Sequence, residues 1–108
     1  MMEVQGMIIG GKFVTESGTG KYIDVINPAT EEVIARVPAA SEEQVDEAVQ
    51  AAWKAFERWS QFSPCGGARL LHRAAHIVEE RAEEIGRSLT AEEGKPLKEA
   101  VREVKGSA

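Results

Sequence analysis

Short apolar runs separated by a glycine pair open the chain. Residues 7–9 and residues 13–14 are apolar, and Gly10 and Gly11 stand between them. Two adjacent glycines readily adopt the positive φ angles of a two-residue hairpin turn. The pattern therefore predicts a first β-hairpin here.

A second pair of extended runs follows. Residues 22–26 alternate as a half-buried strand does, and residues 33–37 resume the pattern. Between them, Asn27 is able to bond its own backbone two residues on, and Pro28 presets φ for the next position of a turn. We expect a second hairpin closed by this Asn-Pro turn, so that β-hairpins occupy residues 7–40.

Apolar residues at spacings of three and four then predict helices over residues 41–108. Ser41 and Gln44 form an S-x-x-Q capping box, which marks the start of the first helix. Burying an aromatic side chain is worth roughly 2–3 kcal/mol, so the three aromatics of this helix require a partner surface. Its apolar stripe contains Val45, Ala48, Val49, Ala52, Trp53, Phe56 and Trp59.

Two further helices are indicated. Ser63 is the expected cap of the second and Pro64 its first residue, while Pro96 starts a third helix within which the sequence ends. The buried side of the second long helix is expected to contain Leu71, Ala74, Ala75, Val78, Ala82, Ile85 and Leu89. The face shared in the third contains Leu97, Ala100, Val101 and Val104.

Composition excludes several classes of protein. The chain has 108 residues, a net charge of −5 and a hydrophobic content of 43%. An acidic chain whose basic residues are interleaved with glutamates is not expected to bind nucleic acid. The longest early apolar run, residues 7–9, is too short for a membrane span or a signal peptide. The single cysteine, Cys65, fits a reducing cytoplasm.

No phosphate or nucleotide site is predicted. Gly6, Gly11 and Lys12 nearly form G-x-x-x-x-G-K, but a phosphate loop needs Ser or Thr next and a helix behind it. Phe13 follows instead, inside an expected strand. A G-x-G-x-x-G turn after a strand is also missing from the sequence.

The candidate reactive side chains have plain structural explanations. His72 and His76 have the spacing of two metal ligands on a helix, but a third ligand and the general-base glutamate are missing. Cys65 lies in the first turn of the second helix, where the dipole favours a thiolate. Because a nucleophile also needs a base and an oxyanion site, we interpret Cys65 as a packing or incidental residue. No catalytic residue is predicted in the chain.

Five segments in order carry a family resemblance. They are "IIGGKFV", "IDVINPATEEVIARVPAAS", "VDEAVQAAWKAFERWS", "RLLHRAAHIVEERAEEI" and "EEGKPLKEAVREV". From about Met7 to Val104, this set resembles the amino-terminal portion of an NAD(P)-dependent aldehyde dehydrogenase. The order and spacing of four short patterns (the N-P-A-T turn, the Trp-ended helix, the Arg-Leu-Leu helix and E-x-G-K-P) make the resemblance specific.

The resemblance implies an α/β fold in which residues 1–108 are an incomplete part of the cofactor-binding domain. It implies two hairpins, two long helices and the start of a third, packed on a Rossmann-like domain. Such enzymes oxidise aldehydes to carboxylic acids with NAD or NADP, and are expected to be homodimers or homotetramers. Their catalytic cysteine, general-base glutamate and cofactor loop correspond to positions beyond residue 108. The fragment alone is therefore expected to be inactive scaffold that binds no cofactor tightly.

The resemblance also implies one candidate metal site. In several family members a monovalent cation is held by main-chain carbonyls before the Asn-Pro turn and by an acidic side chain before the glycine of E-x-G-K-P. The matching positions are Val25, Ile26 and Glu92. Oxygen ligands suit a hard cation, although Glu92 is one carbon longer than the aspartate often found there.

Two other interpretations stay open at this point. The chain could be a self-standing or split-chain interaction module that docks through Trp53, Phe56 and Trp59. It could also be a homo-oligomer that covers its apolar faces with copies of itself. No nucleic acid or membrane partner is expected in either case.

Overall fold

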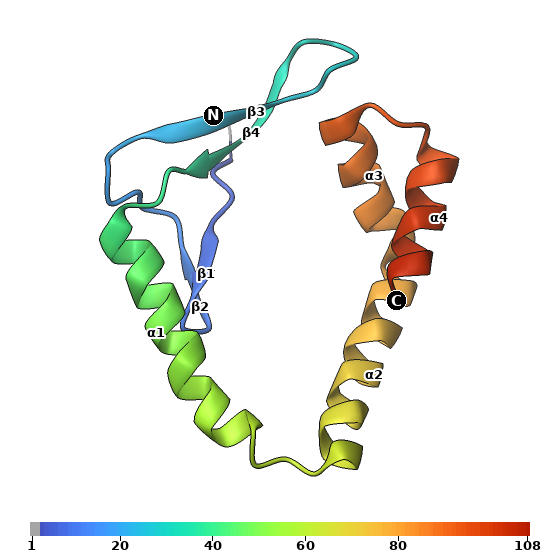
Figure 1. Cartoon of the computed structure of the whole chain (residues 1–108). Helices are drawn as coiled ribbons and strands as arrows, with labels where there is room; N and C mark the ends of the chain where they lie inside the picture. Colours follow the sequence, from blue (N-terminus) through green and yellow to red (C-terminus); the bar gives the residue numbers. More distant parts are fainter. Residues whose placement is uncertain (1–2) are drawn as a thin grey trace. The chain divides into compact units, whose positions relative to one another are not determined.

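A computed structural model describes residues 3–108. Two antiparallel hairpins precede four helices (Figure 1), as the sequence predicts for the order of elements. The strands are β1 (Met7–Ile9), β2 (Lys12–Val14), β3 (Tyr22–Ile26) and β4 (Val33–Pro38). The helices are α1 (Glu42–Trp59), α2 (Pro64–Glu80), α3 (Ala82–Glu93) and α4 (Leu97–Ser107).

The chain divides into two compact units. The first contains both hairpins and α1, and the second joins residues 27–32 to residues 62–108. The turn at the tip of the second hairpin thus belongs with α2, α3 and α4. Among the residues described, none of the helices combines the length and the apolar character of a transmembrane span.

Each hairpin is closed by the turn expected for it. Gly10 and Gly11 have φ angles of 59° and 77°, which glycine adopts without strain. Between β3 and β4, Asp24 faces Arg36, and the Arg36 Nε atom donates to Asp24 Oδ1 at 2.7 Å. The register shifts after Val25, so the ladder is irregular where the strand approaches the Asn-Pro turn.

Helix α1 begins with the predicted capping box, which also holds a neighbouring loop. The Gln44 amide donates to Ser41 Oγ (3.2 Å), and the Ser41 amide donates to Gln44 Oε1 (3.1 Å). Gln44 Oε1 also accepts from the Gly18 amide (2.8 Å), while Gln44 Nε2 donates to the Glu16 carbonyl (2.9 Å). One side chain therefore caps the helix and fixes the loop between β2 and β3.

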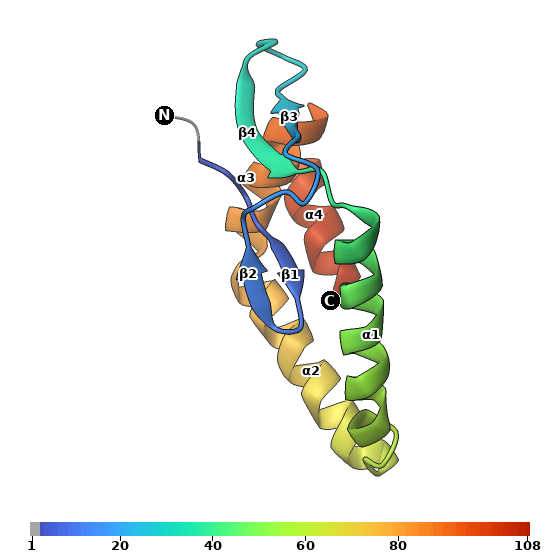
Figure 2. The same ribbon diagram turned by 90° about the vertical axis from the view of Figure 1, so that its left-hand side faces the viewer.

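The apolar stripe expected on α1 is present but uncovered. No residue of α1 is buried. The helix lies beside the first hairpin (Figure 2) and contacts β1. The contact is on its alanine side, because a Cβ placed on Gly10 would lie 3.7 Å from Ala51 Cβ. Val49 and Trp53 lie on the exposed remainder of the helix.

The second long helix is present over its predicted length but is divided at Arg81. This residue has φ −99° and ψ 13°, outside helical values, and its amide still donates to the Ile77 carbonyl (3.0 Å). Two nitrogens of Arg81 donate to the two carboxylate oxygens of Glu84, at 3.0 and 2.7 Å. This hydrogen-bonded pair lowers the pKa of Glu84 below its ordinary value.

The tightest packing in the second unit lies between α3 and α4. Ala82 on α3 and both Ala100 and Val104 on α4 are buried. Gly86 is buried on the same side of α3. Small side chains allow two helix backbones to approach closely, so these residues set the α3–α4 distance.

Candidate functional site

The Asn-Pro turn is a hydrogen-bonded loop with one strained residue. The Ala29 amide donates to Asn27 Oδ1 at 2.9 Å, which is the local bond predicted from the sequence. The Asn27 amide donates to the Glu32 carbonyl (2.9 Å), and the Glu31 amide donates to the Asn27 carbonyl (2.8 Å). Glu31 has a φ of 61°, the only positive φ found at a described residue other than glycine. Hydrogen bonds of Asn27 with residues further along the turn therefore close it.

The same turn packs against the end of α3. Gly94 follows α3 with a φ of 88°, and its amide donates to the Thr90 carbonyl at 2.9 Å. A Cβ on Gly94 would lie 2.9 Å from Pro28 Cγ, so only glycine leaves room for the proline ring. The "NPAT" and "EEGKP" segments, far apart in the sequence, meet here.

A shallow hollow of about 320 Å³ lies beside this contact. Among the polar atoms that the structure describes, the Thr90 hydroxyl is buried without a hydrogen-bond partner. The residues around the hollow are Asn27, Ala29, Arg87, Thr90, Ala91, Gly94 and Leu97. Arg87 is not free, because it donates to Glu83 Oε1 at 2.6 Å.

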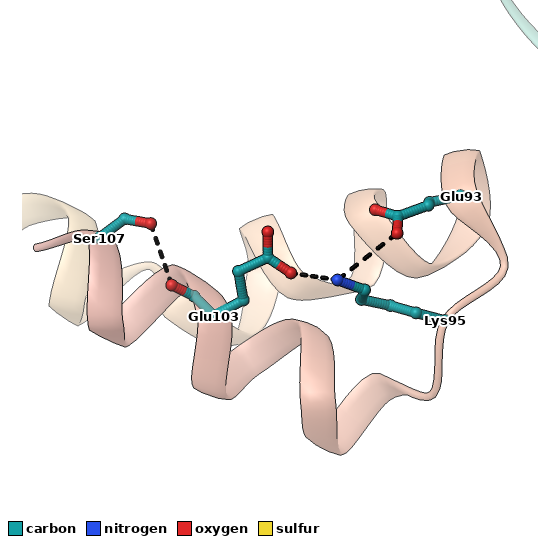
Figure 3. Close-up of polar contacts among 4 residues, drawn as sticks. All are labelled: Glu93, Lys95, Glu103 and Ser107. Atoms are coloured by element: carbon teal, nitrogen blue, oxygen red, sulfur yellow. Dashed lines mark hydrogen bonds and ion pairs between the residues drawn. The ribbon is translucent and has the colours of Figure 1, made fainter.

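Lys95 joins the end of α3 to α4 (Figure 3). Its ammonium group pairs with Glu103 and lies 3.5 Å from Glu93 Oε1. The hydrogen bond to Glu103 raises the pKa of Lys95, and both glutamates add to the effect by their charge. Ser107 Oγ donates to the Glu103 carbonyl at 3.0 Å one turn further along.

Sequence reasoning missed the role of Lys95. Lys95 and Glu103 are eight positions apart, and Lys95 lies outside both helices, before Pro96 and the start of α4, so no helical spacing pairs them. Only the packing of α4 on α3 brings Glu103 beside Lys95. The lysine of E-x-G-K-P is therefore a structural cation in this chain.

The residues expected at the cation site belong to different compact units of the chain. Val25 and Ile26 end β3, at the irregular step in the ladder, and belong to the first unit. Glu92 is exposed in the last turn of α3, in the second unit. A carboxylate at a helix C-terminus meets the negative end of the helix dipole, so a cation beside Glu92 would be favourable. The carboxylate oxygens of Glu92 are donors of the kind that a hard cation prefers.

The remaining candidate side chains lie on the helix surface. Cys65 is exposed in the first turn of α2. His72 and His76 are exposed on the same helix, and His76 Nε2 lies 3.3 Å from Glu80 Oε1. The described residues contain no cluster of three or more His, Cys, Asp or Glu side chains able to hold a metal.

These elements agree with a known family over nearly the whole chain. The model of the aldehyde dehydrogenase family matches residues 13–108. The chain belongs to the aldehyde dehydrogenase family. The "NPAT" turn and the "EEGKP" turn, which pack together through Pro28 and Gly94, both lie inside the matched region.

Three relatives illustrate the likeness. Malonate-semialdehyde dehydrogenase 1 of Geobacillus kaustophilus is 44% identical over 96 residues, which cover 89% of this chain and 20% of the relative. Lactaldehyde dehydrogenase of Escherichia coli has a TM-score of 0.93 at 36% identity, covering 99% of this chain and 22% of that one. A point mutant of betaine aldehyde dehydrogenase from Staphylococcus aureus, in complex with NAD+, has a TM-score of 0.85 at 32% identity. The match covers 93% of this chain and 20% of that one.

The chain thus spans about a fifth of the length of these relatives. Its described glycines with positive φ lie at hairpin and loop turns and at the end of α3, at Gly10, Gly11, Gly20 and Gly94. None of them stands between a described strand and a following helix, where a dinucleotide turn is built.

Proposed function

We propose that this chain is the amino-terminal part of the cofactor-binding domain of an NAD(P)-dependent aldehyde dehydrogenase, and that it supplies framework to the enzyme. The family match over residues 13–108 is the observation that carries the proposal. The sequence motifs add to it, because the Asn-Pro turn and the E-x-G-K-P turn are packed together by residues of the two motifs.

The surroundings of three candidate side chains support the framework role. Lys95 is engaged by carboxylates, Gln44 holds a cap and a loop, and Cys65 lies exposed on the surface. A thiolate nucleophile needs a positioned base and an oxyanion site. In the complete enzyme these groups, and the loop that binds NAD or NADP, are supplied by polypeptide that corresponds to positions beyond residue 108.

The substrate class is an aldehyde that is oxidised to a carboxylic acid. The G. kaustophilus relative is named for malonate semialdehyde, so a short aldehyde bearing a carboxylate is the first substrate to assay. We also propose that Val25 and Ile26 carbonyls and the Glu92 carboxylate hold a monovalent cation in the complete enzyme. The single cysteine supports a cytoplasmic location, and a homodimer or homotetramer is the assembly we expect.

A chimera tests the proposal directly. The part of E. coli lactaldehyde dehydrogenase that matches this chain is replaced by residues 1–108, and NAD(P)H formation is followed with lactaldehyde and with malonate semialdehyde. We expect the chimera to be folded and active, while the same enzyme with the matched part deleted is inactive. A chimera that is made in soluble form but fails to oxidise either aldehyde would count against the assignment.

The isolated chain provides the second test. Purified residues 1–108 should give no turnover with NAD or NADP and no saturable heat of cofactor binding. Turnover by the isolated chain that Cys65→Ser removes would show that the chain carries its own active site.

A further inference from the structure

Two histidines share one side of helix α2. His72 and His76 are four positions apart within Pro64–Glu80, and both are exposed. Side chains at this spacing are neighbours on a helix, with Cβ atoms about 5–6 Å apart. Two imidazoles placed in this way are able to bind one metal ion, as they do in helical zinc motifs. They are also the two histidines of the chain, so the pair is its full supply of imidazole ligands.

A carboxylate already orients one of the two rings. His76 Nε2 lies 3.3 Å from Glu80 Oε1, one turn further along the helix. Pairing through Nε2 leaves the other ring nitrogen, Nδ1, able to bind a metal ion. Histidines that bind metals typically use their second nitrogen to bond a carboxylate, which fixes the ring and makes it a stronger donor. Glu80 therefore lies where such an orienting group is expected.

The surroundings of the pair allow an ion to bind. Helix α2 has no buried residue, and 71% of the His76 side chain is exposed. Core packing therefore does not prevent the two rings from turning until their nitrogens converge on one ion. Arg69 and Arg73 lie within one turn of the pair on the amino-terminal side, and Glu79 and Glu80 follow it. Positive and negative charges are thus balanced on this part of the helix, and a cation is not repelled.

The chemistry of the donors selects the class of ion. Imidazole suits zinc, copper and nickel, whereas magnesium and calcium prefer oxygen ligands. Since the described residues contain no metal-binding cluster of three or more His, Cys, Asp or Glu side chains, His72 and His76 supply two ligands and water completes the coordination. Zinc sites of enzymes have three protein ligands and an activated water. The pair on α2 is therefore a site for reversible binding and not for catalysis.

We propose that His72 and His76 form a surface site for a divalent transition-metal ion of the zinc and copper class, with Glu80 orienting His76. The bound ion bridges two successive turns of α2. This helix carries Gly66 and Gly67 in its first turn, and glycine is a poor helix former. An ion that binds the helical form and not the unfolded one stabilises the helix, so the site acts as a clamp on α2.

Titration of the purified chain with zinc chloride tests the site. All proteins carry Cys65→Ser, so that a thiolate is not the ligand. Isothermal titration calorimetry should show one zinc ion per chain. Either His72→Gln or His76→Gln should weaken binding at least about tenfold, because two linked ligands bind an ion much more tightly than one. Equal affinity in the parent and in these variants would overturn the proposal, and so would half an ion per chain, which would mean that the metal joins two copies.

A relocated histidine separates the effect of spacing from that of composition. His76→Gln combined with Ala74→His keeps two histidines on α2, but at positions i and i+2, which do not face each other on a helix. This variant should bind zinc as weakly as His76→Gln alone, with far-ultraviolet circular dichroism confirming that each protein is helical. Parental affinity in the relocated variant would overturn a site that depends on the four-residue spacing.

The clamp and the orienting carboxylate have their own measurements. Saturating zinc should raise the Tm of the parent chain by several degrees, reversibly on addition of EDTA, and should leave that of His76→Gln unchanged. An unchanged Tm of the parent would contradict the clamp. Glu80→Ala should weaken zinc binding at least about threefold, whereas Glu79→Ala, which removes the same charge from the neighbouring position, should change it by less than about twofold. Equal effects of these two substitutions would overturn the role given to Glu80.

Discussion

Replacing Gly86 by alanine should weaken the packing of α3 on α4. A Cβ at this position would lie 2.7 Å from Val101 Cγ2, 3.1 Å from Val101 N and 3.2 Å from Val101 Cα. The Val101 side chain is able to rotate away from the new methyl group, but its backbone atoms are not. The two helices must therefore move apart, and the buried Ala82 and Ala100 lose contacts as they do.

The expected change in the free energy of unfolding is the difference between two opposing effects. Alanine in a helix interior is favoured over glycine by about 1 kcal/mol. Forcing a methyl group into a well-packed contact costs about 1–3 kcal/mol, and here backbone makes relief difficult. We expect Gly86→Ala to lower the free energy of unfolding by about 1–2 kcal/mol. In a domain of this size that corresponds to a decrease in Tm of roughly 5–10 °C.

The control is another helical glycine. A Cβ on Gly106, in α4, would meet nothing within 4 Å. Gly106→Ala should therefore keep or raise stability, by up to about 1 kcal/mol. Both variants are compared with the parent chain by urea and thermal unfolding, followed by far-ultraviolet circular dichroism. If Gly86→Ala stabilised the chain as much as Gly106→Ala, the close approach of α3 and α4 would be refuted.

Three further substitutions probe the turns and caps. Gly94→Ala places a methyl group at a residue with positive φ and against the Asn-Pro turn. It should lower the free energy of unfolding, measured by thermal denaturation, by about 1–3 kcal/mol. An unchanged Tm would show that the turn does not pack against Gly94. Gln44→Ala removes a cap and two loop bonds and should cost about 1–2 kcal/mol, with exposed Gln50→Ala, on the same helix, within about 0.5 kcal/mol of the parent. Because Lys95 has a raised pKa, its pairing with Glu103 stabilises the fold below the ordinary lysine pKa and is lost as the pH rises through the higher folded value. Lys95→Met should flatten the alkaline decline in stability measured by denaturation across a pH series, and an identical decline in both proteins would exclude this pair as its cause.

The local elements of this protein could be predicted because each carries its own signal. The capping box at Ser41 and Gln44, the Ser63 cap and the Asn27 turn all form as their residue types predict. These are bonds between residues two or three positions apart, so chain chemistry alone specifies them. The family resemblance was likewise carried by short motifs and is confirmed by the match over residues 13–108.

Contacts between distant segments could not be predicted in the same way. The contact of Pro28 with Gly94 depends on how the Asn-Pro turn packs on the end of α3, and the ion pair of Lys95 with Glu103 depends on how α4 packs on α3. No pattern in the sequence indicated that the long helix divides at Arg81. The apolar periodicity of α1 also predicted a buried stripe, but within this chain its alanine side makes the contact.

The sequence by itself determined the order of the elements, their caps and turns, and the family to which they belong. Each of these follows from local bonds or from motif order. Only the tertiary structure decided which face of each helix contacts another element, and which distant polar groups form hydrogen bonds or ion pairs. A helical spacing shows that a face is apolar, but only close packing of backbones, as at Gly86, selects the surface that will lie against it.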